Sequence, residues 1–144
     1  MVSMAIRTAL LVCPLLANAG DDARDRALGQ VVADYVGLYR RETLDRWREL
    51  FLPAFTAAST RPDGTVNLRG LDEFFTAQKR YLDSGRAIRE ELENVRIERS
   101  GRLASVWADF VLHDEAETSR GRLVLLLVEE KGAFKIHALM FSYD

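Results

Sequence analysis

The chain has 144 residues, of which 48% are hydrophobic and 29% charged, and its formal net charge is −2. A chain of this size and composition is typical of one soluble globular domain that buries its own core without disulfides or metals. Because the charge is slightly negative, no general basic surface is available for a polyanion, and a nucleic-acid partner is not expected.

The N-terminus has the three-part pattern of a secretory signal. A positive charge precedes an apolar run over residues 8–16, and Ala17-Asn18-Ala19 places small residues where a signal peptidase reads them. We therefore predict cleavage after Ala19, a periplasmic or secreted protein, and one domain over residues 20–144. The apolar run is shorter than the roughly 20 residues that span a bilayer, so no permanent membrane anchor is expected. The alternative is a retained segment whose true start is Met4.

Two helices are predicted in the first part of the domain. From Asp21 or Asp22, apolar residues recur at spacings of three and four as far as about Arg41, which indicates an amphipathic helix. A second, short helix is expected after Thr43. It should end at Pro53, because the residue before a proline is disfavoured in the helical conformation.

A hairpin and a third helix follow. Arg61-Pro62-Asp63-Gly64 predicts a turn between short strands at residues 54–60 and 65–68, since proline presets one dihedral angle and glycine tolerates the inverted one. Gly70 then opens a helix with an aromatic stripe, and Gly85 is placed to terminate it.

The rest of the chain is predicted to be a bent strand and a three-stranded meander. In residues 88–99 the apolar positions change parity near Glu93-Asn94, which predicts a β-bulge. The meander comprises Leu103–His113, Arg122–Glu129 and Phe134–Ser142, with Gly132 in the last turn. Apolar residues occupy both faces of the last strand, so we expect helices to cover one face and a second subunit, in a homodimer, to cover the other.

This order of elements resembles the nuclear transport factor 2-like superfamily, in particular its SnoaL-like branch. Local phrases carry the resemblance as well: Val31-Val32-Ala33-Asp34-Tyr35, Arg69-Gly70-Leu71-Asp72-Glu73-Phe74-Phe75, and Gly132-Ala133-Phe134-Lys135-Ile136. It implies an α+β, cone-shaped fold in which a curved, mostly antiparallel sheet wraps against three helices and leaves a pocket. Members include isomerases, dehydratases, cyclases, epoxide hydrolases, ligand carriers and dimerisation modules, so the fold does not define the function.

For two activities known in the superfamily, this chain lacks residues that the chemistry requires. The resemblance places the oxyanion-binding acid of ketosteroid-isomerase-like members at Val124, which cannot donate a hydrogen bond. The Arg-x-Asp pair of epoxide-hydrolase-like members corresponds to Trp107-Ala108-Asp109, which keeps the aspartate alone. By the same precedent, Trp107, Asp109, His137, Leu139 and Phe141 are expected to face the pocket.

The leading hypothesis is a domain that binds a small apolar or aromatic molecule without a cofactor. Asp109 and His137 are the candidate acid–base pair of a cofactor-free dehydratase, isomerase or hydrolase. The alternatives are a structural hydrogen-bonded pair, or an Asp109 that meets solvent at the outer face of its strand. Whether a reaction occurs at all is left open, and a purely structural dimerisation module is a third possibility. The two histidines lack zinc-site spacing, so no metal is expected. Aromatic stripes are commonly core, yet the candidate ligand contacts are Tyr35, Tyr39, Trp47, Phe74, Trp107, Leu139 and Phe141.

Overall fold

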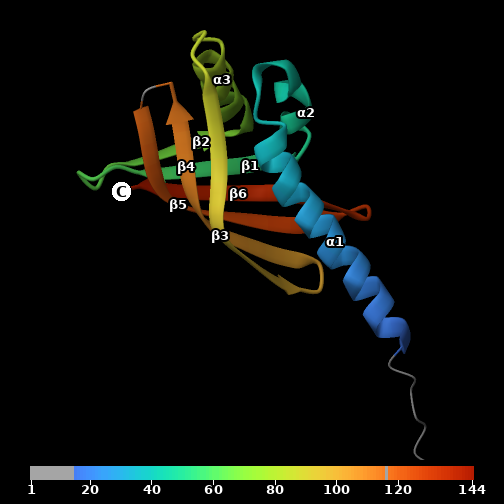
Figure 1. Ribbon diagram of the computed structural model, residues 1–144. Coiled ribbons are helices and arrows are strands. Elements are labelled where there is room, and N and C mark those ends of the chain that lie inside the picture. The colour runs from blue at the N-terminus through green and yellow to red at the C-terminus, as the bar shows by residue number, and fades with distance from the viewer. Residues whose placement is uncertain (1–14, 116) are drawn as a thin grey trace, which may run out of the picture.

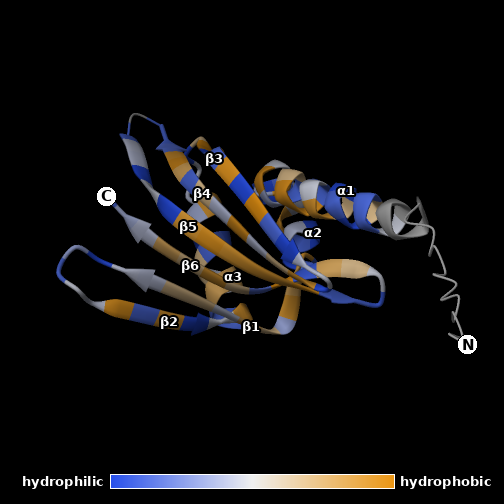
Figure 2. Ribbon diagram, turned by 90° about the horizontal axis from the view of Figure 1, so that it is seen from below, coloured by the Kyte–Doolittle hydropathy of each residue, from blue (hydrophilic) through white to orange (hydrophobic). Residues whose placement is uncertain are grey.

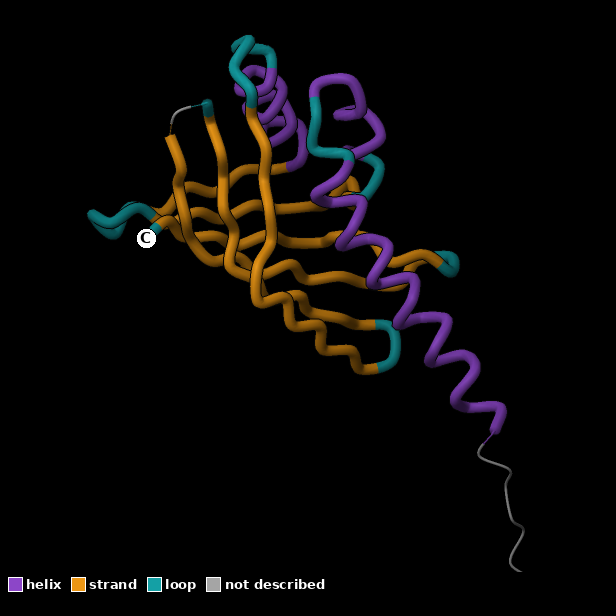
Figure 3. Tube along the Cα trace, in the orientation of Figure 1, coloured by secondary structure: helices purple, strands orange, loops and turns teal. Residues whose placement is uncertain are grey.

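Six strands form the single sheet of this computed structural model, which describes residues 15–115 and 117–144 (Figure 1). The strands are β1 (Phe51–Thr60), β2 (Val66–Gly70), β3 (Ile88–Ser100), β4 (Leu103–Asp114), β5 (Glu117–Glu130) and β6 (Ala133–Tyr143). They lie in the order β2-β1-β6-β5-β4-β3, and only the β1–β6 pair is parallel. The sheet is curved and not closed (Figure 3), so the predicted α+β class and cone-shaped architecture are confirmed.

Three helices accompany the sheet. They are α1 (Leu15–Gly37), α2 (Leu44–Arg48), which follows a single 3-10 turn at Arg41–Thr43, and α3 (Leu71–Leu82). Helix α1 contacts β3 and β6, whereas α3 contacts β1, so the helices cover one face of the sheet. No helix in the described part of the chain is both long enough and apolar enough to cross a membrane.

The predicted leader falls largely outside the described residues. Residues 1–14 are not described, and residues 15–19 belong to the start of α1. Cleavage after Ala19 therefore stays a prediction.

The second helix is shorter than the sequence predicted. It ends at Arg48, and the chain is already in β1 when it reaches Pro53. The register between β1 and β6 shifts between Phe51 and Thr56, and this irregular stretch accommodates a proline that has no N–H for a ladder hydrogen bond. Phe51 enters the strand because its ring is buried against Trp47, with centroids 4.6 Å apart.

The predicted bulge in β3 is confirmed. The pairing with β4 shifts between Glu93 and Arg96, and Asn94 takes a positive φ of 52°. Strand β5, in contrast, begins at Glu117 rather than Arg122. Its first residues are polar and show no apolar alternation, so backbone pairing with the end of β4 alone extends the strand.

The core lies between the helices and the inner face of the sheet, the face that carries Val106, Phe110, Leu123, Leu125 and Ile136. Strand β5 is apolar over residues 123–128 and polar toward both ends, whereas apolar and polar residues are mixed along β3 (Figure 2). An aromatic cluster closes the core beneath α2, and its members are Tyr35, Tyr39, Trp47, Phe51, Phe55 and Phe74.

The outer face of the sheet carries exposed apolar side chains. Cross-strand pairing aligns Trp107 with Val124 and Val124 with Met140, and Leu126 lies two residues further along β5. Trp107, Leu126 and Met140 are 45%, 40% and 49% exposed. The helices therefore cover only the inner of the two apolar faces that the sequence predicted.

Candidate functional site

A cavity of about 470 Å³ lies between the inner face of the sheet and helices α1 and α3. Strand alternation places apolar residues of β4, β5 and β6 on its floor: Phe110, Leu112, Leu123, Leu139 and Phe141. The helices contribute Tyr35, Tyr39, Phe74, Ala77, Gln78 and Tyr81 to the wall. The cavity thus combines an apolar floor with a rim and wall that carry many polar groups.

Glu90 is the acidic residue in this wall. In the half of β3 before the bulge it shares the inner face with Ile88 and Leu92, and it pairs with Leu112 of β4. Its side chain is half-buried. Burial raises the pKa of the Glu90 carboxyl to about 7, because a desolvated carboxylate is disfavoured relative to the neutral acid. Glu90 can therefore either take up or release a proton near neutral pH.

Tyrosine hydroxyls surround the same space. Burial, followed by the nearby Glu90, raises the pKa of Tyr35, Tyr39 and Tyr143, so all three remain protonated donors. The Tyr39 hydroxyl donates to Oε1 of Gln78 at 2.5 Å. Within the described residues, the hydroxyl of Tyr35 makes no hydrogen bond to the protein, which leaves it available to a bound molecule.

One rim of the cavity is held by a polar cluster. The Tyr81 hydroxyl donates to Oδ2 of Asp114 at 2.7 Å, and Nη1 of Arg86 lies 2.8 Å from the same oxygen. The second oxygen of Asp114 is buried without a partner in the described part of the chain. This cluster joins α3 to the end of β4 and so fixes one side of the entrance.

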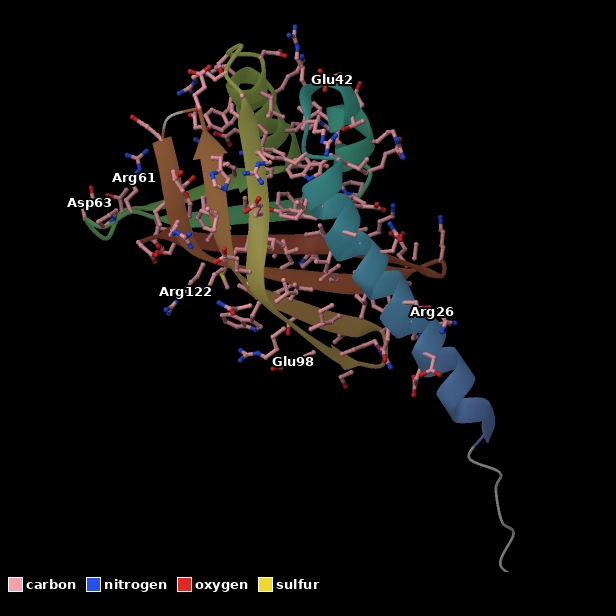
Figure 4. The ribbon with its side chains drawn as sticks, viewed as in Figure 1. Arg26, Glu42, Arg61, Asp63, Glu98 and Arg122 are labelled. Carbon is pink, nitrogen blue, oxygen red and sulfur yellow. The ribbon has the colours of Figure 1, made fainter. Side chains whose placement is uncertain are left out.

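The opposite rim, formed by the β1–β2 hairpin, is cationic. Arg61 and Arg69 line it, together with the neutral side chains of Ser59 and Asn67. Figure 4 places Arg61 near the tip of this hairpin, beside Asp63. The cavity therefore has a cationic side at β1 and β2 and an acidic residue on β3, at the other edge of the sheet.

A second depression, of about 870 Å³, lies outside the cone between α2 and the start of α3. Charged residues line much of it, and Arg48 already pairs with Asp72 across it. Because it is open and its charges are partly matched, the cavity inside the cone is the better candidate site.

Five of the predicted ligand contacts line the cavity: Tyr35, Tyr39, Phe74, Leu139 and Phe141. Trp47 does not, because it is 2% exposed within the aromatic cluster, where its Nε1 donates to the Tyr35 carbonyl at 2.8 Å. Trp107 lies on the outer face of the sheet, so the prediction that it lines the cavity is wrong.

The expectation that Asp109 and His137 face the pocket together is wrong. Asp109 lies on the outer face, where it accepts a hydrogen bond from Nδ2 of Asn94 at 2.7 Å and lies 3.6 Å from Nε of Arg122. His137 is exposed at a register shift in β6. Arg122 pairs with Ser142, five residues beyond His137, so the two side chains are separated by roughly 15 Å along the sheet.

Sequence reasoning missed Glu90 and the two arginines. A signal for Glu90 was present, since apolar residues two positions before and after it, Ile88 and Leu92, assign it to the face that packs on the core. Arg61 and Arg69 gave no such signal. Arg61 lies in a polar turn, and Arg69 alternates with Val66 and Leu68, so the pattern assigns it to the solvent face rather than to the core face. Within residues 15–115 and 117–144, no group of three or more His, Cys, Asp or Glu side chains could hold a metal ion.

Comparison with known proteins places the chain in a family. Residues 28–143 match the SnoaL-like domain, and the protein belongs to this family. A search of curated proteins finds no significant match.

Several solved structures have a similar fold over most of this chain. A candidate scytalone dehydratase from Novosphingobium aromaticivorans has a TM-score of 0.71 at 15% identity, covering 88% of this chain and 88% of that one. A candidate dehydratase of the nuclear transport factor 2-like family from Streptomyces avermitilis has a TM-score of 0.71 at 13% identity, covering 86% and 98%. A nuclear transport factor 2-like protein of unknown function from Shewanella baltica has a TM-score of 0.64 at 14% identity, covering 84% and 94%. These similarities show the fold alone.

Proposed function

We propose that this SnoaL-like domain binds one small molecule with an apolar or aromatic body in its cone cavity. The observation that supports this most directly is the cavity of about 470 Å³ itself, in which an aromatic and aliphatic floor is surrounded by polar side chains. This volume and lining are typical of small-molecule sites.

Blocking the cavity tests this proposal. Ser119 is exposed on the inner face at the mouth, and its neighbour Thr118 points to the opposite face of β5. We expect calorimetry with 1-naphthoate and its neutral methyl ester to detect a single site, which Ser119→Trp weakens at least about ten-fold and Thr118→Trp leaves unchanged. Absence of binding by both compounds, or unaltered binding by Ser119→Trp, would contradict it.

A second candidate function is proton-transfer catalysis by Glu90. A pKa of about 7 suits a general base at neutral pH, and the free Tyr35 hydroxyl can hydrogen-bond a developing oxyanion. Candidate dehydratases among the similar structures make elimination a reasonable reaction class. In this reaction Glu90 takes the C–H proton next to a carbonyl and then gives it to the departing β-hydroxyl. The C–O bond breaks, a C=C bond forms, and water is released.

Deuterium exchange separates catalysis from binding alone. With 1-tetralone in D₂O, the wild-type protein should accelerate exchange of the protons next to the carbonyl, and Glu90→Gln should lower that rate by roughly a hundred-fold or more. Asp109→Asn is the control and should exchange at the wild-type rate, because its carboxylate lies on the outer face. Equal rates for wild type and Glu90→Gln would leave binding as the function.

We also propose a homodimer through the outer face of the sheet. Exposed Trp107, Leu126 and Met140 form an apolar surface that the chain itself does not cover. Light scattering should report a dimer that Met140→Glu dissociates, whereas Arg46→Glu on α2 should leave it intact. A monomeric wild-type protein would overturn this assembly.

Export remains part of the proposal on the strength of the N-terminal sequence. Cell fractionation of the full chain with a C-terminal tag should recover it outside the cytoplasm, beginning at Gly20. Recovery of an uncleaved cytoplasmic chain would exclude this.

A further inference from the structure

We propose that Arg69, assisted by Arg61, binds a carboxylate group of the ligand at the mouth of the cavity, so that the ligand is a small organic acid with an apolar body. This inference rests on the proposed binding function and names the chemical class of the molecule bound. Three observations support the inference: the side chain of Arg69 on β2 lies on the inner face, its charge has no carboxylate partner among the described residues, and Glu90 lies at the opposite side of the cavity.

Strand pairing fixes the inward position of Arg69. It lies opposite Ala57, which is buried on the inner face, and Asn67 two residues before it lies opposite Ser59. The intervening Leu68 is 73% exposed on the other face. Alternation along β2 therefore directs both Arg69 and Asn67 to the cavity, and both are half-buried.

The charge of Arg69 is not matched by a neighbouring carboxylate. No ion pair within 4.0 Å involves Arg69 in the described part of the chain, whereas Arg86 on the opposite rim pairs with Asp114. The positive charge of Arg61 is partly balanced by the nearby Asp63 carboxylate. The main partner of that carboxylate is Thr65, whose backbone N–H donates to it at 2.8 Å. A half-buried guanidinium without a partner favours an anion, and its planar fork suits a carboxylate.

The acidic residue lies at the other side of the site. Arg69 is on edge strand β2 and Glu90 on the opposite edge strand, β3, with the cavity between them. An anionic group would be repelled by ionised Glu90 and attracted by Arg69, so the ligand takes one orientation. Its carboxylate lies at the β1–β2 hairpin, its apolar body over Leu123 and Phe141, and its neutral end near Glu90 and Tyr35.

Comparison of 1-naphthoate with methyl 1-naphthoate tests the assignment. We expect the acid to bind the wild-type protein about ten-fold more tightly than the ester, and Arg69→Gln to remove this preference while leaving ester binding unchanged. The control is Arg80→Gln, which removes an exposed arginine of α3 outside the cavity and should preserve the preference. Raising the salt from about 0.05 to 0.5 M should weaken binding of the acid more than that of the ester.

Several outcomes would overturn the inference and remain distinct from failure of the proposed function. Equal affinities of acid and ester for the wild-type protein, or equal losses for both in Arg69→Gln, would exclude recognition of a carboxylate while leaving the binding function standing. Tighter binding of 1-naphthyl phosphate than of 1-naphthoate would assign the site to phosphate esters instead. Thermal unfolding of Arg69→Gln at the wild-type temperature shows that the lost preference does not come from misfolding.

Discussion

The rings of Phe110 and Tyr143 meet at right angles across Gly121, with their centroids 5.2 Å apart and an interplanar angle of 89°. The three residues are aligned on β4, β5 and β6, so the glycine lies directly between the two aromatic positions. A Cβ atom on Gly121 would lie 2.1 Å from the Ser142 carbonyl oxygen and 2.5 Å from Cζ of Phe110. The missing side chain therefore shapes the floor of the cavity.

Gly121→Ala should destabilise the protein by about 1–3 kcal/mol, because the methyl group forces the strand backbone and Phe110 to move. Gly29→Ala on exposed α1 is the control, since a methyl group there would meet nothing within 4 Å and alanine is the better helix former. Denaturant unfolding of the two variants measures the difference. Wild-type stability of Gly121→Ala would show that the sheet relaxes freely at this point.

The order of the elements and the bulge could be predicted from the sequence, but not the ends of α2, β1 and β5 or the faces of β4. The parity change in residues 88–99 is explained by one extra residue in the strand, and the structure has this β-bulge between Glu93 and Arg96. In β4, by contrast, both parities carry aromatic residues: Phe110 on one and Trp107 on the other. Pattern alone cannot choose between two apolar faces, and the choice made by family precedent was wrong for Trp107 and Asp109.

The candidate site was harder to predict than the fold, because it depends on elements distant in the sequence. Tyr35 could be proposed as a cavity residue from the aromatic stripe of its helix, and Phe141 from family precedent. The relation of Glu90 to Arg69 arises only when the sheet order places β3 and β2 at opposite edges of one curved surface. No local pattern contains that information.

Substitutions at Asn94 test whether Asn94 stabilises the β3 bulge, where its side chain contacts Asp109. Its backbone has the left-handed conformation of the bulge and its Nδ2 donates to Asp109. Asn94→Val should destabilise the fold by about 1–3 kcal/mol, because a β-branched residue is strained at positive φ. Asn94→Gly should be nearly neutral, since glycine accepts this conformation. The two unfolding free energies measure the contrast, and equal values would mean that the bulge is not held at Asn94.

Titration of Glu90 should appear as a pH-dependent stability. Its pKa is raised from 4.5 to about 7 in the folded chain, so the folded state binds more protons than the unfolded state between these values. Stability is therefore fully present below about pH 4.5 and is lost as the pH rises through 7, by roughly 1–3 kcal/mol after allowing for partial solvent access. The groups that face it, the hydroxyls of Tyr35, Tyr39 and Tyr143, stay neutral throughout.

Glu90→Gln isolates this effect. The variant should match the wild-type stability near pH 4 and exceed it near pH 8, because glutamine has no charge to desolvate. Urea unfolding at several pH values between these limits gives the difference curve directly. Equal stabilities of the two proteins at pH 8 would show that the Glu90 carboxylate is well solvated.

Arg99 should control how firmly α1 holds the end of the sheet. Its side chain is 14% exposed, its Nε donates to Asp25 at 2.8 Å, and its Nη2 lies 3.1 Å from Asp21 on the same helix. Arg99→Met removes both ion pairs, so amide exchange in α1 around these aspartates should be faster, on the order of two- to five-fold. Arg96→Met on the same strand is the control, because Arg96 pairs only with its strand neighbour Glu98 among the described residues. Hydrogen–deuterium exchange with mass spectrometry measures both variants, and unchanged exchange of α1 in Arg99→Met would show that apolar packing alone secures the helix.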